Sequence, residues 1–523
     1  MMKKINICLF LFTCGCCHTM AQDIYKVESF TGTDLNGTSR YVGMGGAMNA
    51  LGADISTMGN NPAGIGLFRK SDVSMTGSLQ IQPNGIDYSE IGKTRASFDQ
   101  IGFVYAVPFH QAGLEYFNFG FNYHKRRNFK NSFAAMGVGT NGLSQSLQML
   151  DLAYVGNDWL DLSNPDDREL TTPLTNLGYD TQMIFPVYDA DGHLTGYEPS
   201  SAKCYDYQRA QWGGIQQYDF NISMNWNHQV YAGITLGVQD VNFNSAIYYA
   251  EHLLDDTGGT HLYYTHQKEV ITGNGFDIKL GVILRPIEES PFRIGFSVHT
   301  PTWFDLTQDS YLYMNSPYAS KDHDYSEQDV RIGDNAFKIR TPWKFNLSLG
   351  TTVGNYLALD AEYEYADYSS SAISYHSYSY YWGGDVKDIA LNDECKTHLN
   401  GVSTFKVGAE ARILPNTYLR LGYNFISAPI KKDAFLNLFT ASDSYYYNTN
   451  TDYVNLGETN RVTAGLGWKG KHFYIDAAYQ YQKQEGDLYT FHVPEMNSQI
   501  NRLKPQNIDF SKHSALLTLG YKF

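Results

Sequence analysis

The sequence predicts an all-β protein: a 14-stranded antiparallel transmembrane β-barrel with an N-terminal hatch, or plug, in its lumen. Three observations predict this fold. Apolar and polar residues alternate along many runs of the chain, as they do in strands with one apolar face. Short and long connections between these runs also alternate, as in membrane barrels. A non-alternating stretch rich in glycine and small apolar residues precedes the first run.

Composition excludes several other classes of protein. Of the 523 residues, 15% are aromatic and 18% are charged, whereas a coiled coil or a disordered chain has fewer aromatic residues or more charge. Beyond the first twenty residues, no apolar run reaches the roughly 18–20 residues that a membrane-spanning helix needs. The formal net charge is −15 and there is no long basic cluster, which argues against nucleic acid as a partner.

Residues 1–21 have the features of a secretory signal peptide, so we expect the chain to be exported. Lysines near the start are followed by an apolar stretch over residues 5–17 and by a small-residue cleavage site at 19–21. Four of the six cysteines lie in this segment. The other two, Cys204 and Cys395, could pair in an oxidising compartment, but two cysteines so far apart make no disulfide framework.

Residues 22–70 do not alternate, and we expect them to form the hatch inside the barrel. The stretch 39–68 is rich in glycine and small apolar residues, which let one backbone segment pack closely against another. Such a stretch is too apolar for a free tail. Within it, Arg40 could meet a ligand carboxylate; the alternative interpretation is a salt bridge to the barrel wall.

The hatch ends in the motif Asn61-Pro62-Ala63-Gly64, just before the first predicted strand. Pro62 would make the turn rigid, Asn61 can bond to neighbouring backbone, and Ala63 permits close packing. We therefore predict that the motif fixes the hatch in place. An ordinary turn before a strand is the alternative interpretation.

Residues 71–523 are predicted to form the barrel with long outward loops. In 218–226, Tyr, Phe, Ile, Met and Trp occupy the even positions and alternate with Asp, Asn and Ser. Fourteen such runs start near residues 72, 97, 114, 213, 230, 274, 291, 337, 356, 402, 417, 459, 472 and 509. Short turns follow every second run from the second onward, whereas the other connections are longer, and the largest covers about 131–211.

A closed barrel would satisfy the backbone inside a membrane. Hydrocarbon cannot bond to N–H and C=O groups, so only helices or a closed sheet can cross it. Strands of about 9–11 residues are long enough to cross, and the runs reach that length. A large soluble β-protein with an aromatic core is the alternative. In the long loop, the spacing of Leu143, Leu147 and Leu150 predicts a short helix.

Several motifs in the hatch and the wall carry a resemblance to a known family. In the hatch they are Gly43-Met-Gly-Gly-Ala47, Asp54 followed by Ser56-Thr57, and Asn61-Pro-Ala-Gly64. In the wall they are residues 275–286, His299-Thr-Pro301 and Thr341-Pro-Trp343. With these motifs the mature chain resembles the FadL/TodX/OmpP1 family of outer-membrane transporters for hydrophobic compounds. The resemblance implies a 14-stranded barrel with an N-terminal hatch in the outer membrane of a Gram-negative cell.

The resemblance also implies passive uptake of hydrophobic small molecules such as long-chain fatty acids. Outward loops would capture the ligand, an apolar lumen pocket would hold it, and a kinked strand would release it sideways into the membrane. Burying one methylene group contributes about 0.8 kcal/mol, so a chain of roughly a dozen carbons needs few polar contacts. The candidate ligand-binding residues are Arg40, Leu143, Leu147 and Leu150.

The expected partners are the hydrophobic ligand, outer-membrane lipid and the barrel assembly machinery, which would act on the C-terminal strand that ends in Phe523. We expect a monomer without cofactor or metal. No enzymatic activity is expected, since no GxSxG nucleophile motif occurs. Residues 137–142 match the GxGxxG pattern, but they lack the preceding strand and following helix that let such glycines hold a pyrophosphate. The sequence Asp189-Ala-Asp191-Gly192 lacks the glutamate of a calcium loop and predicts a hairpin turn instead.

Two other functions stay open from the sequence. A structural or interaction barrel of the same fold, serving secretion as a scaffold or shuttle, predicts a filled lumen and a large apolar patch on the loops. A general diffusion porin predicts an open polar lumen. Transport of hydrophobic molecules predicts an apolar lining of the lumen pocket.

Overall fold

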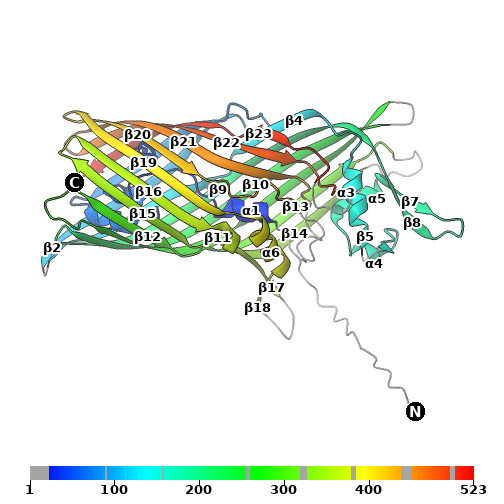
Figure 1. Ribbon diagram of the computed structural model, residues 1–523, viewed down its shortest axis with the longest axis horizontal. Coiled ribbons are helices and arrows are strands. Elements are labelled where there is room, and N and C mark those ends of the chain that lie inside the picture. The colour runs from blue at the N-terminus through cyan, green and yellow to red at the C-terminus, as the bar shows by residue number, and fades with distance from the viewer. Residues whose placement is uncertain are drawn as a thin grey trace, which may run out of the picture.

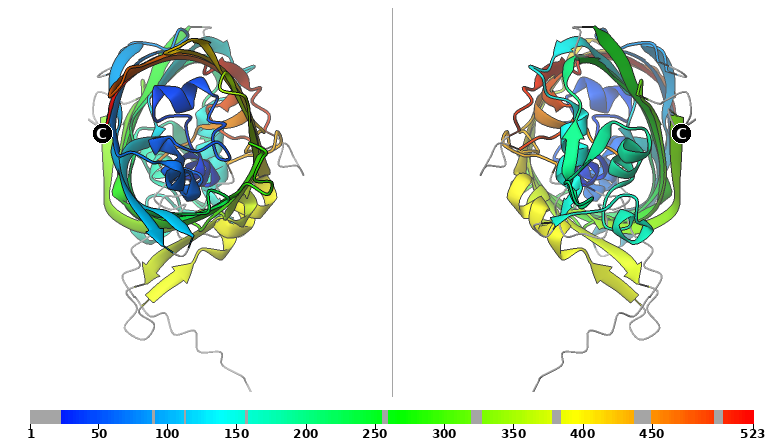
Figure 2. Two further views of the ribbon diagram at one scale, coloured as in Figure 1. Left: turned by 90° about the vertical axis from the view of Figure 1, so that its left-hand side faces the viewer. Right: turned by 90° about the vertical axis from the view of Figure 1, so that its right-hand side faces the viewer.

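The computed structural model describes residues 23–523 except 89–90, 112, 156–157, 255–258, 319–326, 378–383, 437–448 and 495–500. The signal peptide predicted at 1–21 lies outside the described residues. The described chain is a barrel whose bore contains the N-terminal segment (Figures 1 and 2). None of the described helices is long and apolar enough to span a membrane.

Fourteen antiparallel strands form the wall, which confirms the predicted fold class. Several of them consist of two segments separated by a few residues. In chain order the strands are β1 (Asp72–Ile81), β2 (Thr94–Gln111), β3 with β4 (Leu114–Asn128 and Asn131–Gly139), β9 (Ala202–Trp226), β10 (Val230–Leu254), β11 (Thr260–Leu284), β12 with β13 (Arg293–His299 and Trp303–Asn315), β14 with β15 (Glu327–Arg340 and Lys344–Val353), β16 with β17 (Leu357–Asp367 and Ala372–Ser377), β19 (Gly401–Leu414), β20 (Thr417–Ile426), β21 (Tyr453–Lys469), β22 (Phe473–Tyr489) and β23 with β24 (Gln506–Asp509 and Lys512–Lys522).

The sheet closes because the first strand pairs with the last. The register between β1 and β24 runs without a break from Asp72↔Lys522 to Ile81↔His513. The N–H of Phe523 extends this pairing by donating to the carbonyl of Ser71 at 3.1 Å. Closure removes the two edges that an open sheet would expose to lipid.

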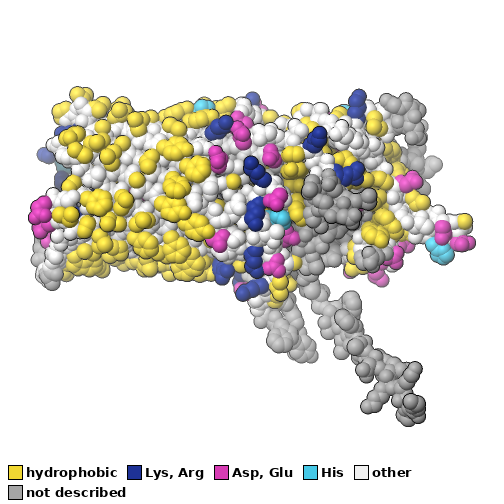
Figure 3. Space-filling model, viewed as in Figure 1, with side chains coloured by type: hydrophobic (Ala, Val, Ile, Leu, Met, Phe, Trp, Pro, Cys, Tyr) yellow, Lys and Arg dark blue, Asp and Glu magenta, His cyan; other side chains and the backbone are white. Residues whose placement is uncertain are grey.

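Outward-facing side chains form an apolar belt at one end of the barrel. On β10 the outward residues Ile234, Leu236 and Val238 are exposed, and the polar Asp240 follows them. Figure 3 shows this belt at the end with the short turns, followed by a band of charged side chains. Strands β9, β10 and β11 have 25 residues each, whereas about 9–11 cross hydrocarbon. Their other halves therefore project beyond the belt.

The N-terminal segment fills the bore. It contains α1 (Ile24–Thr31), α2 (Ser39–Gly43), η1 (Ile55–Gly59) and η2 (Pro62–Leu67), which lie inside the ring of strands in both end views (Figure 2). Its large apolar side chains are buried against one another and against the wall; Val27, Phe30, Val42, Met44, Met48 and Met58 have no exposed surface. The hatch is thus part of the folded core.

A small domain, residues 140–201, closes the end of the barrel opposite the short turns, and we call it the cap. It contains α3 (Gln145–Leu152), β5 (Tyr154–Val155), β6 (Asp158–Trp159), α4 (Pro165–Arg168), α5 (Pro173–Asp180), β7 (Ile184–Tyr188) and β8 (Leu194–Pro199). Its buried Met149 and Leu177 join Tyr205 and Tyr263 of the long strands in one apolar cluster. The mouth of the barrel is therefore filled by packed side chains.

The predicted bounds of the longest loop, about 131–211, are wrong. Residues 131–139 form β4, and β9 already begins at Ala202. Beyond the belt the outward faces of these strands meet water, so they need not be apolar, and the alternation that marks a strand is lost. The short helix predicted inside the loop is present as α3.

Next to the wall, β18 (Gly384–Lys387) forms a hairpin with β17. The 3-10 turn η3 (Tyr368–Ser370) separates β16 from β17, and α6 (Ile389–His398) follows β18. The hairpin projects sideways from the barrel beyond the apolar belt (Figures 1 and 2).

We expect Leu236→Arg to destabilise the barrel, because Leu236 lies in the apolar belt and is 43% exposed to its surroundings. An arginine facing the middle of the bilayer costs about 2–4 kcal/mol. Urea unfolding in lipid vesicles, followed by tryptophan fluorescence, measures this loss. Asp240→Arg, on the same face beyond the belt, is the matched control and should change the free energy of unfolding by less than about 1 kcal/mol. Equal effects of the two changes would contradict the placement of the belt.

Candidate functional site

Buried ion pairs hold the hatch against the wall. Arg40 of α2 donates through Nε and Nη2 to the two carboxylate oxygens of Glu410 on β19, both at 2.9 Å. Arg420 on β20 donates to the same carboxylate and to Asp476 on β22, both at 2.6 Å. Arg40 therefore makes the salt bridge to the wall that was the alternative to a contact with ligand.

Two carboxylates on β16 bind the backbone of the hatch. Glu362 Oε1 accepts hydrogen bonds from the N–H groups of Met48 and Asn49, each at 2.7 Å. Asp360 accepts from the N–H of Leu51 at 2.9 Å. Buried backbone N–H groups need such partners, and here the wall supplies them to a segment that has no regular structure of its own.

The Asn61-Pro-Ala-Gly motif is a capped turn that docks on the wall. Asn61 Oδ1 accepts from the N–H of Ala63 at 3.2 Å, and its Nδ2 donates to the carbonyl of Asn49 at 3.0 Å. Pro62 begins η2, and its carbonyl accepts from the hydroxyl of Ser223 on β9 at 2.8 Å. The motif thus joins two parts of the hatch to each other and to the wall.

Glycine is required where hatch and wall approach most closely. A Cβ on Gly422 of β20 would lie 2.1 Å from the nitrogen of Gly45 in the hatch. A Cβ on Gly281 of β11 would lie 2.0 Å from Oδ1 of Asn61, the first residue of the motif. No side chain fits at such distances, so these glycines allow the hatch to sit directly on the strands.

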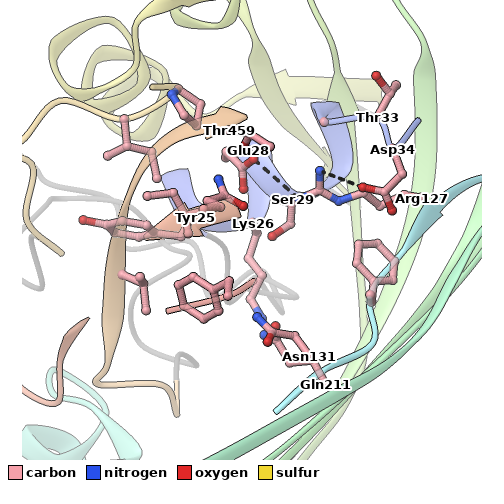
Figure 4. A pocket seen from close by; sticks show the side chains of 18 of the residues that line it. Tyr25, Lys26, Glu28, Ser29, Thr33, Asp34, Arg127, Asn131, Gln211 and Thr459 are labelled. Carbon is pink, nitrogen blue, oxygen red and sulfur yellow. Dashed lines mark ion pairs between the residues drawn. The ribbon is translucent and has the colours of Figure 1, made fainter. Parts of the chain in front are cut away.

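A cavity of about 160 Å³, which we call the first cavity, lies between α1 and the wall (Figure 4). Tyr25, Lys26, Glu28 and Ser29 of α1 line it on the hatch side. The wall contributes many polar and charged side chains, among them Arg127, Arg209, Lys344, Glu364, Asp452, Arg461 and Lys512. This lining differs from the apolar pocket expected from sequence, because the polar positions of the alternating strands face inward.

Several of these charges form ion pairs. Arg209 lies 2.7 Å from the carboxylate of Asp452. Arg127 lies 3.6 Å from Glu28 of α1 and 4.0 Å from Asp34, and Figure 4 marks both pairs. Burial raises the pKa of the Glu28 carboxyl, and the nearby Arg127 guanidinium opposes this rise. These pairs tie α1 to the strands around it.

Three cations at the first cavity have no carboxylate within hydrogen-bonding distance in the described part of the chain. Arg461 comes no nearer to a carboxylate than 3.9 Å, the distance to Asp34. Lys512 Nζ donates to the main-chain oxygen of Lys130 at 2.8 Å, and no carboxylate of the described residues lies within 4.0 Å of the Lys344 ammonium, which also lines the cavity. The cavity can therefore accept an anionic group.

A second cavity of about 100 Å³ adjoins the first on the side of the short turns. Both cavities are lined by Asp34, Lys344, Glu364 and Arg461. Most other side chains around the second cavity are also polar, including His124, Arg126, Asp277, Lys279 and Lys406. The two cavities thus form a polar space above the rest of the hatch.

The wall is open between β2 and β3 beside these cavities. The pairing of the two strands stops at His124, and the hatch takes the place of the missing partner. The N–H of Asp34 donates to the carbonyl of Arg126 at 2.9 Å, and Asn36 Nδ2 donates to the carbonyl of Lys125 at 3.1 Å. At this point hydrogen bonds from the hatch, and not from a neighbouring strand, satisfy the backbone carbonyls at the edge of β3.

A third cavity of about 220 Å³ lies against this opening. Arg95 and Ser97 of β2, Lys125 of β3 and Asp240 of β10 are among the residues that line it. Asn128 lines both the first and the third cavity. The lumen and the third cavity are therefore only one side chain apart at this place.

The cap is tied to the wall through Glu251 of β10, which is completely buried. Its carboxylate accepts hydrogen bonds from Ser144 Oγ and the N–H of Gln145, each at 2.6 Å, and from the hydroxyl of Tyr249 at 2.5 Å. Burial raises the pKa of Glu251, while these three hydrogen bonds oppose the rise. The cap is thus docked by polar contacts as well as by apolar packing.

Known structures share this arrangement. A FadL homologue of Pseudomonas aeruginosa superposes with a TM-score of 0.52 at 13% identity, over 94% of this chain and 99% of that one. The toluene transporter TodX of P. putida superposes with a TM-score of 0.50 at 11% identity, over 94% and 99% of the two chains. The shared feature is the fold. No family model matches the sequence, and no curated protein matches it.

The three leucines predicted to contact ligand lie in the cap. Leu143 is buried in its core, and Leu147 and Leu150 pack against it, partly buried. They help to close the mouth and are not among the residues around the first cavity. The described cysteines, Cys204 on β9 and Cys395 on α6, are both free.

Sequence reasoning did not find the residues of the first cavity. Arg127, Lys344, Arg461 and Lys512 occupy inward positions of their strands or lie at strand ends. A charged residue at an inward position of a membrane strand was the available signal. It does not tell which of these residues face the hatch and which face a cavity, since that depends on how the hatch folds.

We expect Glu410→Gln to weaken the attachment of the hatch, because Arg40 loses its carboxylate partner, whereas Arg420 keeps Asp476. Removing one partner of a buried ion pair costs about 3–5 kcal/mol. Heat-dependent mobility on gels and urea unfolding measure the loss. Glu198→Gln, an exposed change on β8, is the control and should stay within about 0.5 kcal/mol of the parent protein. An equal result for both changes would show that the Glu410 pairs do not hold the hatch.

Proposed function

We propose that this protein is an outer-membrane channel for the passive uptake of hydrophobic small molecules such as long-chain fatty acids. One observation carries the proposal: the first cavity lies inside a plugged barrel, directly beside an opening between β2 and β3. A porin would need a continuous bore, whereas here the hatch and the cap occupy it. The fold shared with the FadL homologue and with TodX supports the same function.

The membrane and the orientation follow from the two ends of the barrel. Short turns join the strands at one end, and long strands and the cap extend from the other. In outer-membrane barrels short turns face the periplasm and longer segments face the exterior. The cap would therefore stand on the cell surface.

The charged lining of the first cavity favours a ligand with a charged group over a purely apolar one. Arg461, Lys344 and Lys512 offer cationic groups without a bonded carboxylate. A ligand with a carboxylate head would neutralise them, while its alkyl tail would gain about 0.8 kcal/mol for each methylene group removed from water. We therefore propose an amphipathic carboxylic acid as the ligand in preference to a plain hydrocarbon.

Release sideways through the β2–β3 opening would avoid the polar hatch below. Phe98, beside the opening on the part of β2 that does not pair with β3, stacks on Tyr123 of β3 with ring centroids 5.8 Å apart on the lipid-facing side. A tail that passes between the strands there would meet apolar surface at once. The pairing of β2 with β3 ends at His124 in the described chain, so the contacts that would have to yield are the hydrogen bonds of Asp34 and Asn36 to β3 and that of Lys125 to Ser97.

A role in binding a protein partner is the second candidate. The specific observation in its favour is the cap, whose packed apolar core fills the mouth of the barrel. In the described chain, the bore is therefore closed at the cell-surface end. Tyr154, Leu170 and Tyr188 are exposed on the cap and would supply apolar contacts.

Native mass spectrometry of gently extracted protein separates the two functions. Transport predicts that a fatty acid or a similar amphiphile is retained with the barrel at about one per chain. A protein partner present in a fixed ratio, with no such ligand retained, would contradict the transport proposal.

We expect Arg461→Met to reduce the affinity for dodecanoate about 10- to 100-fold, because a hydrogen bond to a charged group contributes about 1.5–3 kcal/mol. Dodecanol has the same tail and no charge, so its affinity should not change. Binding of both compounds is measured by calorimetry on the purified barrel. Arg502→Met, a change of an exposed arginine outside the cavities, serves as the control. Loss of both affinities in parallel, or of neither, would contradict the assignment of the carboxylate site.

A further inference from the structure

Three neighbouring strands are interrupted at the same level of the wall. The breaks lie at residues 300–302 between β12 and β13, at 341–343 between β14 and β15, and at 368–371 between β16 and β17. These strands are neighbours in the sheet, since β12 pairs with β15 and β15 with β16. The breaks therefore form one line across the wall and are not scattered irregularities.

Side-chain hydroxyls repair the first part of this line. The hydroxyl of Thr300 accepts from the N–H of Ile278 at 3.0 Å, and the hydroxyl of Thr341 accepts from the N–H of Thr302 at 2.8 Å. These bonds replace ladder hydrogen bonds that the break removes. They join β12 and β13 firmly to the strands on both sides.

In the described chain, no side-chain hydroxyl replaces the missing ladder hydrogen bonds between the β14–β15 strand and the β16–β17 strand. The ladder stops at Arg340↔Ala372 and resumes at Lys344↔Ala366, so residues 341–343 face the longer stretch 367–371. We call these two stretches the seam. The one described bond across it is from Arg340 Nη2 to the carbonyl of Ser370, at 3.4 Å. Over this length the wall is held by side chains and not by its backbone.

The seam lies at the boundary of the membrane. The outward residues Trp343, at the lower end of the seam, and Phe345, below it, are 49% and 46% exposed and belong to the apolar belt. Above it, the outward residues are Arg340 and Lys338, and Lys338 pairs with Asp385 at 2.8 Å. Figure 3 shows the change from apolar to charged surface on this face of the barrel.

Both lumen cavities reach the inner face of the seam. Thr341 and Pro342 line the second cavity, and Tyr368 lines the first. Tyr368 is 6% exposed and fills the seam from inside, while Trp343 covers it from outside. Movement of these two side chains would connect the cavities with the membrane surface without breaking a ladder hydrogen bond.

The route along the axis is less open than this one. The cap fills the mouth with apolar side chains and is docked through Glu251, which accepts three hydrogen bonds. Entry from above would require the cap to leave that contact. A molecule already dissolved in the membrane surface would meet the seam first.

We propose that ligands enter the barrel sideways, from the membrane surface through the seam between β14–β15 and β16–β17, and not through the capped mouth. This inference rests on the proposed function only in taking the entering molecule to be an amphiphile. It makes Trp343 and Tyr368 the outer and inner gates. The rival explanation is that the breaks only let the wall bend where it leaves the membrane.

A disulfide staple tests the seam. Arg340→Cys with Ala372→Cys places two cysteines at paired, outward positions directly above the seam, in a chain with Cys204→Ser and Cys395→Ser. A reporter, Ser29→Cys on α1, lies at the first cavity (Figure 4). The probe is N-dodecylmaleimide supplied in phospholipid vesicles, and its attachment to residue 29 is followed by peptide mass spectrometry. We expect the oxidised staple to slow labelling at least tenfold and reduction to restore the rate.

A control staple, Leu419→Cys with Leu466→Cys, joins paired positions on β20 and β21 where the ladder is continuous, and should leave the rate unchanged. If the first staple prevents folding, Phe345→Cys with Tyr365→Cys, paired below the seam, replaces it. Equal labelling rates with the seam stapled and unstapled would overturn the entrance. Labelling that depends on the staple in a protein that retains no fatty acid would uphold the entrance and count against the transport function alone.

Discussion

The structure depends on one constraint: inside hydrocarbon, no backbone N–H or C=O group can remain without a partner. Pairing of β1 with β24 meets this constraint by closing the sheet. The interruptions of the ladder occur where the constraint weakens. Both the β2–β3 opening and the seam lie at the edge of the apolar belt, beside Phe98 in one case and Trp343 in the other. There, water and lipid headgroups can satisfy backbone that strands do not.

The bore presents the opposite problem, since the inward positions of the strands are polar and a segment of chain is buried among them. Burying a charge costs free energy unless it is paired. Glu410 pairs with both Arg40 of the hatch and Arg420 of the wall, so these buried charges have partners. Glu362 accepts hydrogen bonds from backbone N–H groups of the hatch. Arg461, whose nearest carboxylate in the described chain is 3.9 Å away, lies at both lumen cavities. The inward polar positions of the strands thus serve both to attach the hatch and to line the cavities.

Much of the fold could be predicted from sequence, because a strand with one face toward lipid has a local, period-two signature. The number of strands and their short turns followed from it. The signature fails beyond the belt, where outward residues meet water, and this is why the sequence pattern places residues 131–139 and 202–211 in a loop. The site is less predictable: Arg40 makes the salt bridge to the wall that the sequence leaves open as an alternative, and Leu143 lies in the core of the cap. Which inward residue meets the hatch and which meets a cavity depends on contacts between residues hundreds of positions apart.

The two interruptions of the wall differ in what fills them, and this difference bears on what each can do. At the β2–β3 opening, Asp34 and Asn36 of the hatch bond to the backbone of β3, so the wall there can change only together with the hatch. At the seam, the filling groups are side chains of the wall itself, Tyr368 within and Trp343 outside. The seam can therefore rearrange while the hatch stays anchored by its buried ion pairs. Exchange of molecules through the seam therefore requires no movement of the hatch, whereas release at the β2–β3 opening requires Asp34 and Asn36 to give up their bonds to β3.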